Sequence, residues 1–76
     1  MDNKICLGGF HNYIFFYREK FGYLQRELAA IIGISRQTLC DIENEKQFPN
    51  YKTIAKLLFV FDCKFEDLFY YEVHYV

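Results

Sequence analysis

The chain has 76 residues, which is the size of a single domain, and 53% of them are hydrophobic. Its formal net charge of −1 gives no overall attraction to nucleic acid, although residues 1–40 hold five basic and three acidic side chains and residues 41–76 hold four and seven. No stretch has the unbroken apolar length of a membrane span, and no phosphate-binding loop, carboxylate pair or nucleophile with a base predicts an enzyme.

Apolar spacing and turn residues predict an all-α chain with one short arm and one tail. Gly8 and Gly9 disfavour a helix, so residues 1–11 are predicted to form an N-terminal arm. Residues 12–70 are predicted to form five helices, over residues 12–21, 24–32, 36–44, 51–61 and 65–70. The tail, residues 71–76, alternates apolar and polar side chains and is either a β-strand or a frayed terminus.

Residues 25–44 have the pattern of two helices joined by a tight turn. Four apolar residues are expected to form the inner face of the first helix: Leu28, Ala29, Ile31 and Ile32. Gly33 suits an abrupt helix end because glycine tolerates a positive φ, and Ser35 suits the N-cap of the next helix. Two helices joined by so few residues cross steeply, which is the geometry that presents a second helix to the DNA major groove.

The helix over residues 36–44 has one hydrogen-bonding face and one apolar face. At about 100° per residue, Arg36, Gln37, Cys40 and Asp41 fall on one arc, with Leu39 and Ile42 on the other. Arg and Gln side chains match the guanine and adenine edges in the major groove.

The sequence Gly22-Tyr-Leu-Gln-Arg-Glu-Leu-Ala29, then Gly33-Ile-Ser-Arg-Gln-Thr-Leu39 and Ile42-Glu-Asn44, resembles the Cro/repressor-type helix-turn-helix family, the xenobiotic-response-element (XRE) regulators. The resemblance continues through Pro49, Thr53 and Phe65–Phe69 and covers roughly residues 12–70. It implies a compact, lambda-repressor-like bundle of five helices that binds double-stranded DNA.

The resemblance also assigns roles to individual residues. It implies that the base edges are contacted by Arg36, Gln37, Cys40 and Asp41, and the phosphates by Gln25, Ser35, Asn44 and Lys46. It further implies a largely buried ion pair between Arg18 and Glu43, which both fall at the edge of their helices' apolar stripes.

Four positions depart from the family pattern. Leu24 replaces the Ser or Thr that caps the second helix, Glu45 replaces a glycine, and Asp62 replaces the glycine that ends the fourth helix. Glu45 is expected to bring negative charge near the phosphate backbone. Asp41 on the reading face repels phosphates, although it is able to accept a hydrogen bond from a cytosine amino group.

Cysteine and histidine positions predict neither a metal site nor a cofactor. Cys6, Cys40 and Cys63 lack a C-x-x-C spacing, and His11 and His74 lie near opposite ends of the sequence. Cysteines without a signal peptide favour the reducing cytoplasm. Cys40 is either a small side chain near a base or a redox-sensitive thiol.

Aromatic residues are more numerous after residue 51 than a small core requires, which predicts association between chains. We expect a symmetric homodimer formed by the last helix and the tail, with an interface of Phe65, Phe69, Tyr70, Tyr71, Val73 and Tyr75, and with strand pairing over residues 73–76 as an option. The alternative is a monomer with a few exposed tyrosines.

Two functions are compatible with this sequence. The first is a sequence-specific regulator of transcription, chiefly a repressor, that binds double-stranded DNA as a homodimer. The second is a protein-interaction module, such as an antitoxin or adaptor, on the same helical scaffold; the aromatic surplus and the acidic C-terminal half favour it.

Overall fold

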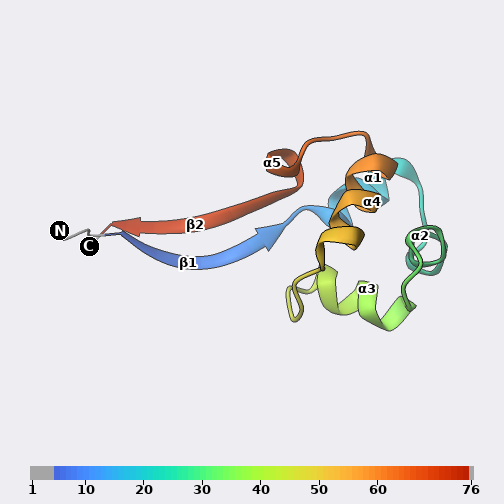
Figure 1. Ribbon diagram of the computed structural model, residues 1–76, viewed down its shortest axis with the longest axis horizontal. Coiled ribbons are helices and arrows are strands. Elements are labelled where there is room, and N and C mark those ends of the chain that lie inside the picture. Colours follow the sequence, from blue (N-terminus) through green and yellow to red (C-terminus); the bar gives the residue numbers. More distant parts are fainter. Residues whose placement is uncertain (1–4, 76) are drawn as a thin grey trace.

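The computed structural model describes residues 5–75 and consists of a helical domain with a projecting two-stranded ribbon (Figure 1). Its extents of 46 × 23 × 21 Å reflect this projection. The elements in chain order are β1 (Ile5–Asn12), α1 (Ile14–Phe21), α2 (Gln25–Ile32), α3 (Arg36–Glu43), α4 (Tyr51–Phe61), α5 (Phe65–Leu68) and β2 (Phe69–Tyr75).

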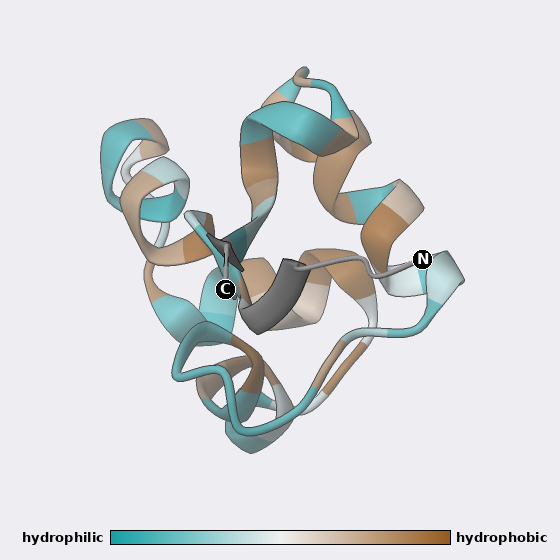
Figure 2. Cartoon of the chain, turned by 90° about the vertical axis from the view of Figure 1, so that its left-hand side faces the viewer, coloured by the Kyte–Doolittle hydropathy of each residue, from teal (hydrophilic) through white to brown (hydrophobic). Residues whose placement is uncertain are grey.

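The helices pack around one apolar core, because each presents its apolar residues inward at helical spacing. Figure 2, which looks along the ribbon toward the helices, shows hydrophobic segments turned mainly toward the middle of the bundle. The buried hydrophobic residues are Ile14, Leu28, Ala29, Ile32, Leu39, Ile42, Leu57, Phe61, Leu68 and Phe69. Ile31 was expected among them but is 52% exposed, so this prediction was wrong.

Local chemistry fixes where the central helices begin and end. Gly33 has a φ of 78° and ends α2 in the left-handed conformation. The Ser35 hydroxyl accepts a hydrogen bond from the Thr38 amide at 3.0 Å, which caps α3. Leu24 supplies no side-chain cap to α2, although Glu27 Oε1 accepts from the Leu24 amide at 2.8 Å. Asp62 tolerates the left-handed conformation, with a φ of 50°, at the end of α4.

The two ends of the described chain pair with each other, so the fold is mostly helical with a small two-stranded sheet rather than all-α, and residues 5–12 form a strand instead of the predicted arm. β1 and β2 are antiparallel, with Phe10 opposite Tyr71 and Asn12 opposite Phe69. The arm prediction rested partly on Gly9, which lies inside β1 opposite Glu72. A Cβ built on Gly9 would lie 3.3 Å from the His11 ring nitrogen Nε2.

The predicted tail is a strand that starts earlier than expected. The last helix ends at Leu68 and the chain continues directly into β2, while Val76 lies outside the described residues. Phe69 was predicted to lie at a dimer interface but is only 3% exposed and belongs to the core. Phe65 stacks on it at 4.8 Å between ring centroids and remains 41% exposed.

Candidate nucleic-acid interface

The α2–turn–α3 unit exposes the side chains that were predicted to contact base edges. Leu39 and Ile42 on the opposite side of α3 are buried in the core, which fixes how the helix is rotated. Arg36 and Gln37 are exposed at its first turn, and Cys40 and Asp41 are half-buried one turn later. A large ligand that approaches this side of α3 would therefore contact Arg36 and Gln37 first.

Behind this face, four polar residues form a continuous chain of hydrogen bonds. Arg18 Nε donates to Glu43 Oε2 at 2.6 Å, and the two side chains are only 9% and 5% exposed. Glu43 Oε1 accepts from Gln25 Nε2 at 3.0 Å, and Gln25 Oε1 accepts from Arg36 Nη1 at 3.2 Å. The chain links α1, α2 and both ends of α3, so it holds the two helices of the motif together.

The other face residues also bond along α3. Gln37 Nε2 donates to Asp41 Oδ1 at 3.0 Å, which orients the amide and partly satisfies the carboxylate. Asn44 Nδ2 lies 3.3 Å from the Cys40 sulfur as a hydrogen-bond donor. Each pair is separated by four residues, the spacing at which helical side chains meet. The Gln37 side chain is thereby held over the outer surface of the helix.

The residues predicted to contact phosphates differ in how free their side chains are. The Gln25 amide donates to Glu43 and accepts from Arg36, so both of its polar atoms already have partners. The Ser35 hydroxyl, which caps α3, also donates to the Thr38 hydroxyl at 2.8 Å. These two residues therefore have chiefly the backbone amides of their helix starts to offer a phosphate. Asn44 and Lys46 are exposed just after α3.

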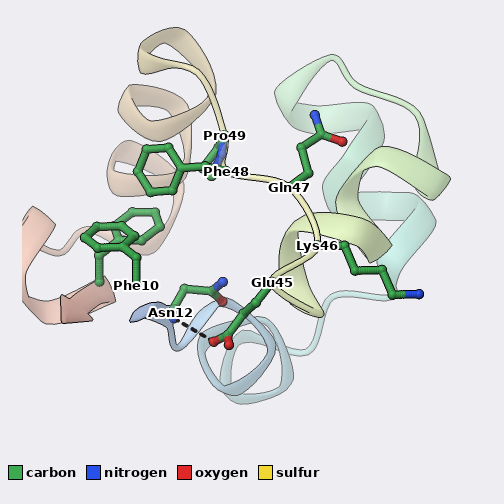
Figure 3. A pocket seen from close by; sticks show the side chains of 8 residues that line it. Phe10, Asn12, Glu45, Lys46, Gln47, Phe48 and Pro49 are labelled. Atoms are coloured by element: carbon green, nitrogen blue, oxygen red, sulfur yellow. Dashed lines mark hydrogen bonds between the residues drawn. The ribbon is translucent and has the colours of Figure 1, made fainter. Parts of the chain in front are cut away.

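Glu45, which follows α3, is directed toward the ribbon. Its backbone has a φ of 63°, the left-handed conformation for which the family pattern has glycine. Its carboxylate accepts from His11 Nδ1 at 2.7 Å and from the Asn12 amide at 3.1 Å. Figure 3 shows Glu45 pointing toward Asn12, while Lys46 extends away on the other side. The expected effect of Glu45 on phosphates is reduced because its carboxylate is directed to His11 and the Asn12 amide.

His11 lies between two carboxylates, an arrangement that sequence analysis missed. Its Nε2 lies 3.1 Å from Glu72 Oε1, and this buried nitrogen has no hydrogen-bond partner of standard geometry within residues 5–75. Two facing carboxylates favour the doubly protonated ring, and the pKa of His11 is raised above 6.5 mainly by Glu45 and then by Glu72. His11 lies 34 positions from Glu45 and 61 from Glu72 in the sequence, so no local pattern indicated this cluster.

A helix-turn-helix family profile matches residues 14–68, which span α1 to α5. The chain belongs to the XRE-type helix-turn-helix family. This result confirms the family that the sequence motifs indicated. Membership implies binding to double-stranded DNA and points to a role without catalysis.

Similar proteins come from bacteria and archaea. The chain is 39% identical over 61 residues to the uncharacterized HTH-type transcriptional regulator YvzC of Bacillus subtilis, covering 80% of this chain and 79% of that protein. An uncharacterized HTH-type transcriptional regulator of Methanocaldococcus jannaschii is also 39% identical over 61 residues, which is 80% of this chain and 92% of that protein. One from Archaeoglobus fulgidus is 38% identical over 56 residues, with coverages of 74% and 79%.

Neither a membrane-spanning helix nor a cluster of metal-ligating side chains occurs in the part of the chain that the structure describes. Within residues 5–75, no helix combines the length and apolar character needed to cross a membrane. The same residues bring together no group of three or more His, Cys, Asp or Glu side chains suited to a metal ion. A hollow of about 200 Å³ does lie beside the α3–α4 loop, lined by Phe10, Asn12, Glu45, Lys46, Gln47, Phe48, Pro49 and Phe69 (Figure 3).

The His11–Glu45 contact predicts pH-dependent stability of this helix-turn-helix domain. The pKa of His11 is raised on folding, so the protonated ring stabilises the folded state. This stabilisation is complete below pH 6.5 and is lost as the pH rises through the pKa that His11 has in the folded state. Glu45 is affected oppositely: burial acts to raise its pKa, but hydrogen bonds from His11 and Asn12 lower it overall. The stabilisation that the ionised Glu45 carboxylate gives the folded state is therefore lost at strongly acidic pH.

The prediction is checked by thermal unfolding of the natural chain and of His11→Gln at a series of pH values below and above 6.5. We expect the difference in melting temperature to shrink as the pH rises above 6.5. The comparison removes the effect of His74, which both proteins share. A melting-temperature difference that stays constant with pH contradicts a stabilising charge on His11.

Proposed function

We propose that this protein is a sequence-specific regulator of transcription, a repressor that binds double-stranded DNA as a homodimer in the cytoplasm. The observation that carries the proposal is the exposed pair Arg36 and Gln37 on the first turn of α3, in a chain of the XRE-type family. Arginine and glutamine carry the paired donors and acceptors that discriminate guanine and adenine in the major groove.

In the proposed mechanism α3 enters the major groove. Arg36 and Gln37 contact base edges, with Cys40 and Asp41 one turn behind them, where a thymine methyl or a cytosine amino group fits. The amides at the start of α2 (Gln25) and of α3 (Ser35), with Asn44 and Lys46, contact phosphates. So few cationic contacts give modest affinity per chain, which is why the mechanism requires two chains on a two-fold site.

The test is a binding titration of the full chain against genomic DNA fragments at two salt concentrations. We expect some fragments to bind more tightly than random DNA, and all binding to weaken at the higher salt because phosphate contacts release counterions. If no fragment binds better than random DNA, sequence-specific regulation is contradicted.

A second function, a protein-interaction module such as an antitoxin or adaptor, is favoured by one surface. Phe59 is 86% exposed and Ile31 is 52% exposed, and both line a shallow apolar hollow over α2 and α4 with Ala55, Lys56 and Val60. Exposed apolar patches are typical of sites for protein partners. This second function would be supported if the chain bound no DNA at either salt concentration and co-purified with one stoichiometric protein partner.

A further inference from the structure

The base of the ribbon is bonded to the end of α3 and to the loop that follows it. Asn12 Nδ2, at the end of β1, donates to the carbonyl oxygen of Ile42 at 2.9 Å, and the same carbonyl accepts from the Glu45 amide at 3.0 Å. The Glu45 carboxylate accepts in turn from the Asn12 amide at 3.1 Å and from His11 Nδ1 at 2.7 Å. These bonds hold the last turn of α3 and the start of the α3–α4 loop against β1.

Glu45 has a backbone conformation that its side chain disfavours. Its φ of 63° is in the left-handed region, where the Cβ crowds the following carbonyl oxygen. The bonds to its carboxylate stabilise this conformation, because they form only while the side chain is directed at the ribbon (Figure 3). Lys46, a proposed phosphate contact, is the next residue. A change in the Glu45 backbone would therefore move Lys46 relative to α3.

The surroundings of the His11 ring are those that suit its protonated form. Nδ1 lies 2.7 Å from Glu45 Oε1, and Nε2 lies 3.1 Å from Glu72 Oε1. Ionised carboxylates accept hydrogen bonds and donate none, while a neutral imidazole has a single N–H. A neutral ring in this place would set a nitrogen lone pair against a negative oxygen. Both contacts are therefore favourable only when the ring carries two N–H groups and a positive charge.

The other titratable groups that face His11 keep their charge near neutral pH. Tyr70 on β2 places its ring 5.1 Å from that of His11, and burial raises the pKa of Tyr70 above 10, so its phenol stays neutral. Burial acts to raise the pKa of Glu45, but hydrogen bonds from His11 and Asn12 lower it overall, so this carboxylate stays ionised. His11 is therefore the group of this cluster that changes charge near neutral pH.

We propose that protonation of His11 regulates DNA binding by fixing the loop that carries Lys46. This inference rests on the proposed DNA binding and adds its control by pH. When His11 loses its proton, one carboxylate faces a lone pair and the bond to the other loses its charge assistance. Glu72 is 52% exposed and turns into water, whereas Glu45 loses part of what holds its left-handed backbone. The loop then leaves its fixed conformation, and DNA affinity falls as the pH rises.

The coupling between the proton and DNA is reciprocal. If protonated His11 favours the loop conformation that binds DNA, bound DNA raises the pKa of His11 by the same free energy. A difference of one pKa unit between the free and the bound protein corresponds to a tenfold change in affinity. We expect DNA affinity to fall about three- to tenfold between about pH 5.5 and pH 8.5, the range in which histidine titrates.

The first experiment measures affinity for the preferred genomic fragment across this pH range at fixed salt, for the natural chain and three variants. His11→Gln should remove most of the pH dependence. Glu45→Gly should keep the affinity and also lose the pH dependence, because glycine adopts the left-handed conformation without help from a carboxylate. His74→Gln is the control and should behave as the natural chain, since it removes the other histidine.

Glu45→Gly separates the proposed coupling from a simpler effect. The negative field of the phosphates favours a protonated histidine even without any change in the loop. Because Glu45→Gly retains His11, that field alone would leave its pH dependence as large as in the natural chain. This result would overturn the inference, as would an affinity that His11→Gln leaves equally dependent on pH.

A second measurement uses the natural chain without DNA, so it avoids any effect of substitution on folding. NMR follows the His11 ring signals, identified by their loss in His11→Gln, together with the backbone order parameters of residues 44–48. We expect these order parameters to fall as His11 loses its proton, while those of α4 stay constant. Order parameters of the loop that do not change with the His11 titration overturn the inference.

The two experiments distinguish failure of this inference from failure of the proposed function. A loop that follows His11 in a chain without preference for any DNA fragment contradicts the regulator and leaves the coupling of His11 to the loop standing. Preferential DNA binding by a chain whose loop ignores the protonation of His11 supports the regulator and contradicts its control by pH.

Discussion

Arg18→Ala is expected to lower the free energy of unfolding by about 3–5 kcal/mol, because it leaves the carboxylate of Glu43 buried without its charged partner. The two side chains are 9% and 5% exposed, so water is unable to replace the lost hydrogen bonds. Urea unfolding followed by circular dichroism measures this change. Since small domains have only about 5–15 kcal/mol in total, the variant is expected to be close to unfolding.

Two further variants show whether burial of the charge is the cause. Arg26→Ala removes an exposed arginine from α2 and should change stability by less than about 0.5 kcal/mol. The double variant Arg18→Met, Glu43→Leu removes both charges and should recover most of the lost stability. An Arg18→Ala protein as stable as the natural chain would show that the pair contributes nothing.

Gln37→Ala is expected to weaken binding to a specific DNA site by about 1–3 kcal/mol, roughly 5- to 150-fold, with little change on random DNA. The reason is that an amide contacting a base edge discriminates between sequences. Lys46→Ala should instead weaken binding to both DNAs and reduce the slope of log affinity against log salt by about 0.9, the value for one phosphate contact.

Lys64→Ala is the matched control for these two variants. Lys64 precedes α5, which lies on the far side of the helical domain from α3 (Figure 1). Its removal should leave both the affinity and the salt slope unchanged. If Gln37→Ala and Lys46→Ala affected specific and random DNA equally, α3 would not be the helix that reads the sequence.

The helical part of the fold was predictable because its signals are local. The helix end at Gly33, the cap at Ser35, and the apolar spacing of Leu39 and Ile42 each act within one or two turns of helix. The family motifs extended these signals to the ion pair between Arg18 and Glu43, whose partners lie 25 positions apart. Spacing alone would not have paired them.

The ribbon was not predictable in the same way, because its pairing joins the two ends of the sequence. Gly9 disfavours a strand on average, and only the folded chain shows that a Cβ at this position would lie close to the His11 ring, at 3.3 Å from Nε2. The alternation after residue 70 left strand and frayed end open, since a strand is stabilised by its neighbour rather than by its own sequence.

The sequence by itself therefore determined the helices, the turn before α3 and which residues face outward on α3, since these depend on neighbours within a few positions. Only the tertiary structure decided that β1 and β2 pair, that Phe69 is in the core and that His11 lies between Glu45 and Glu72. These features depend on contacts between segments more than 30 positions apart, whose free energy appears only when the whole chain folds.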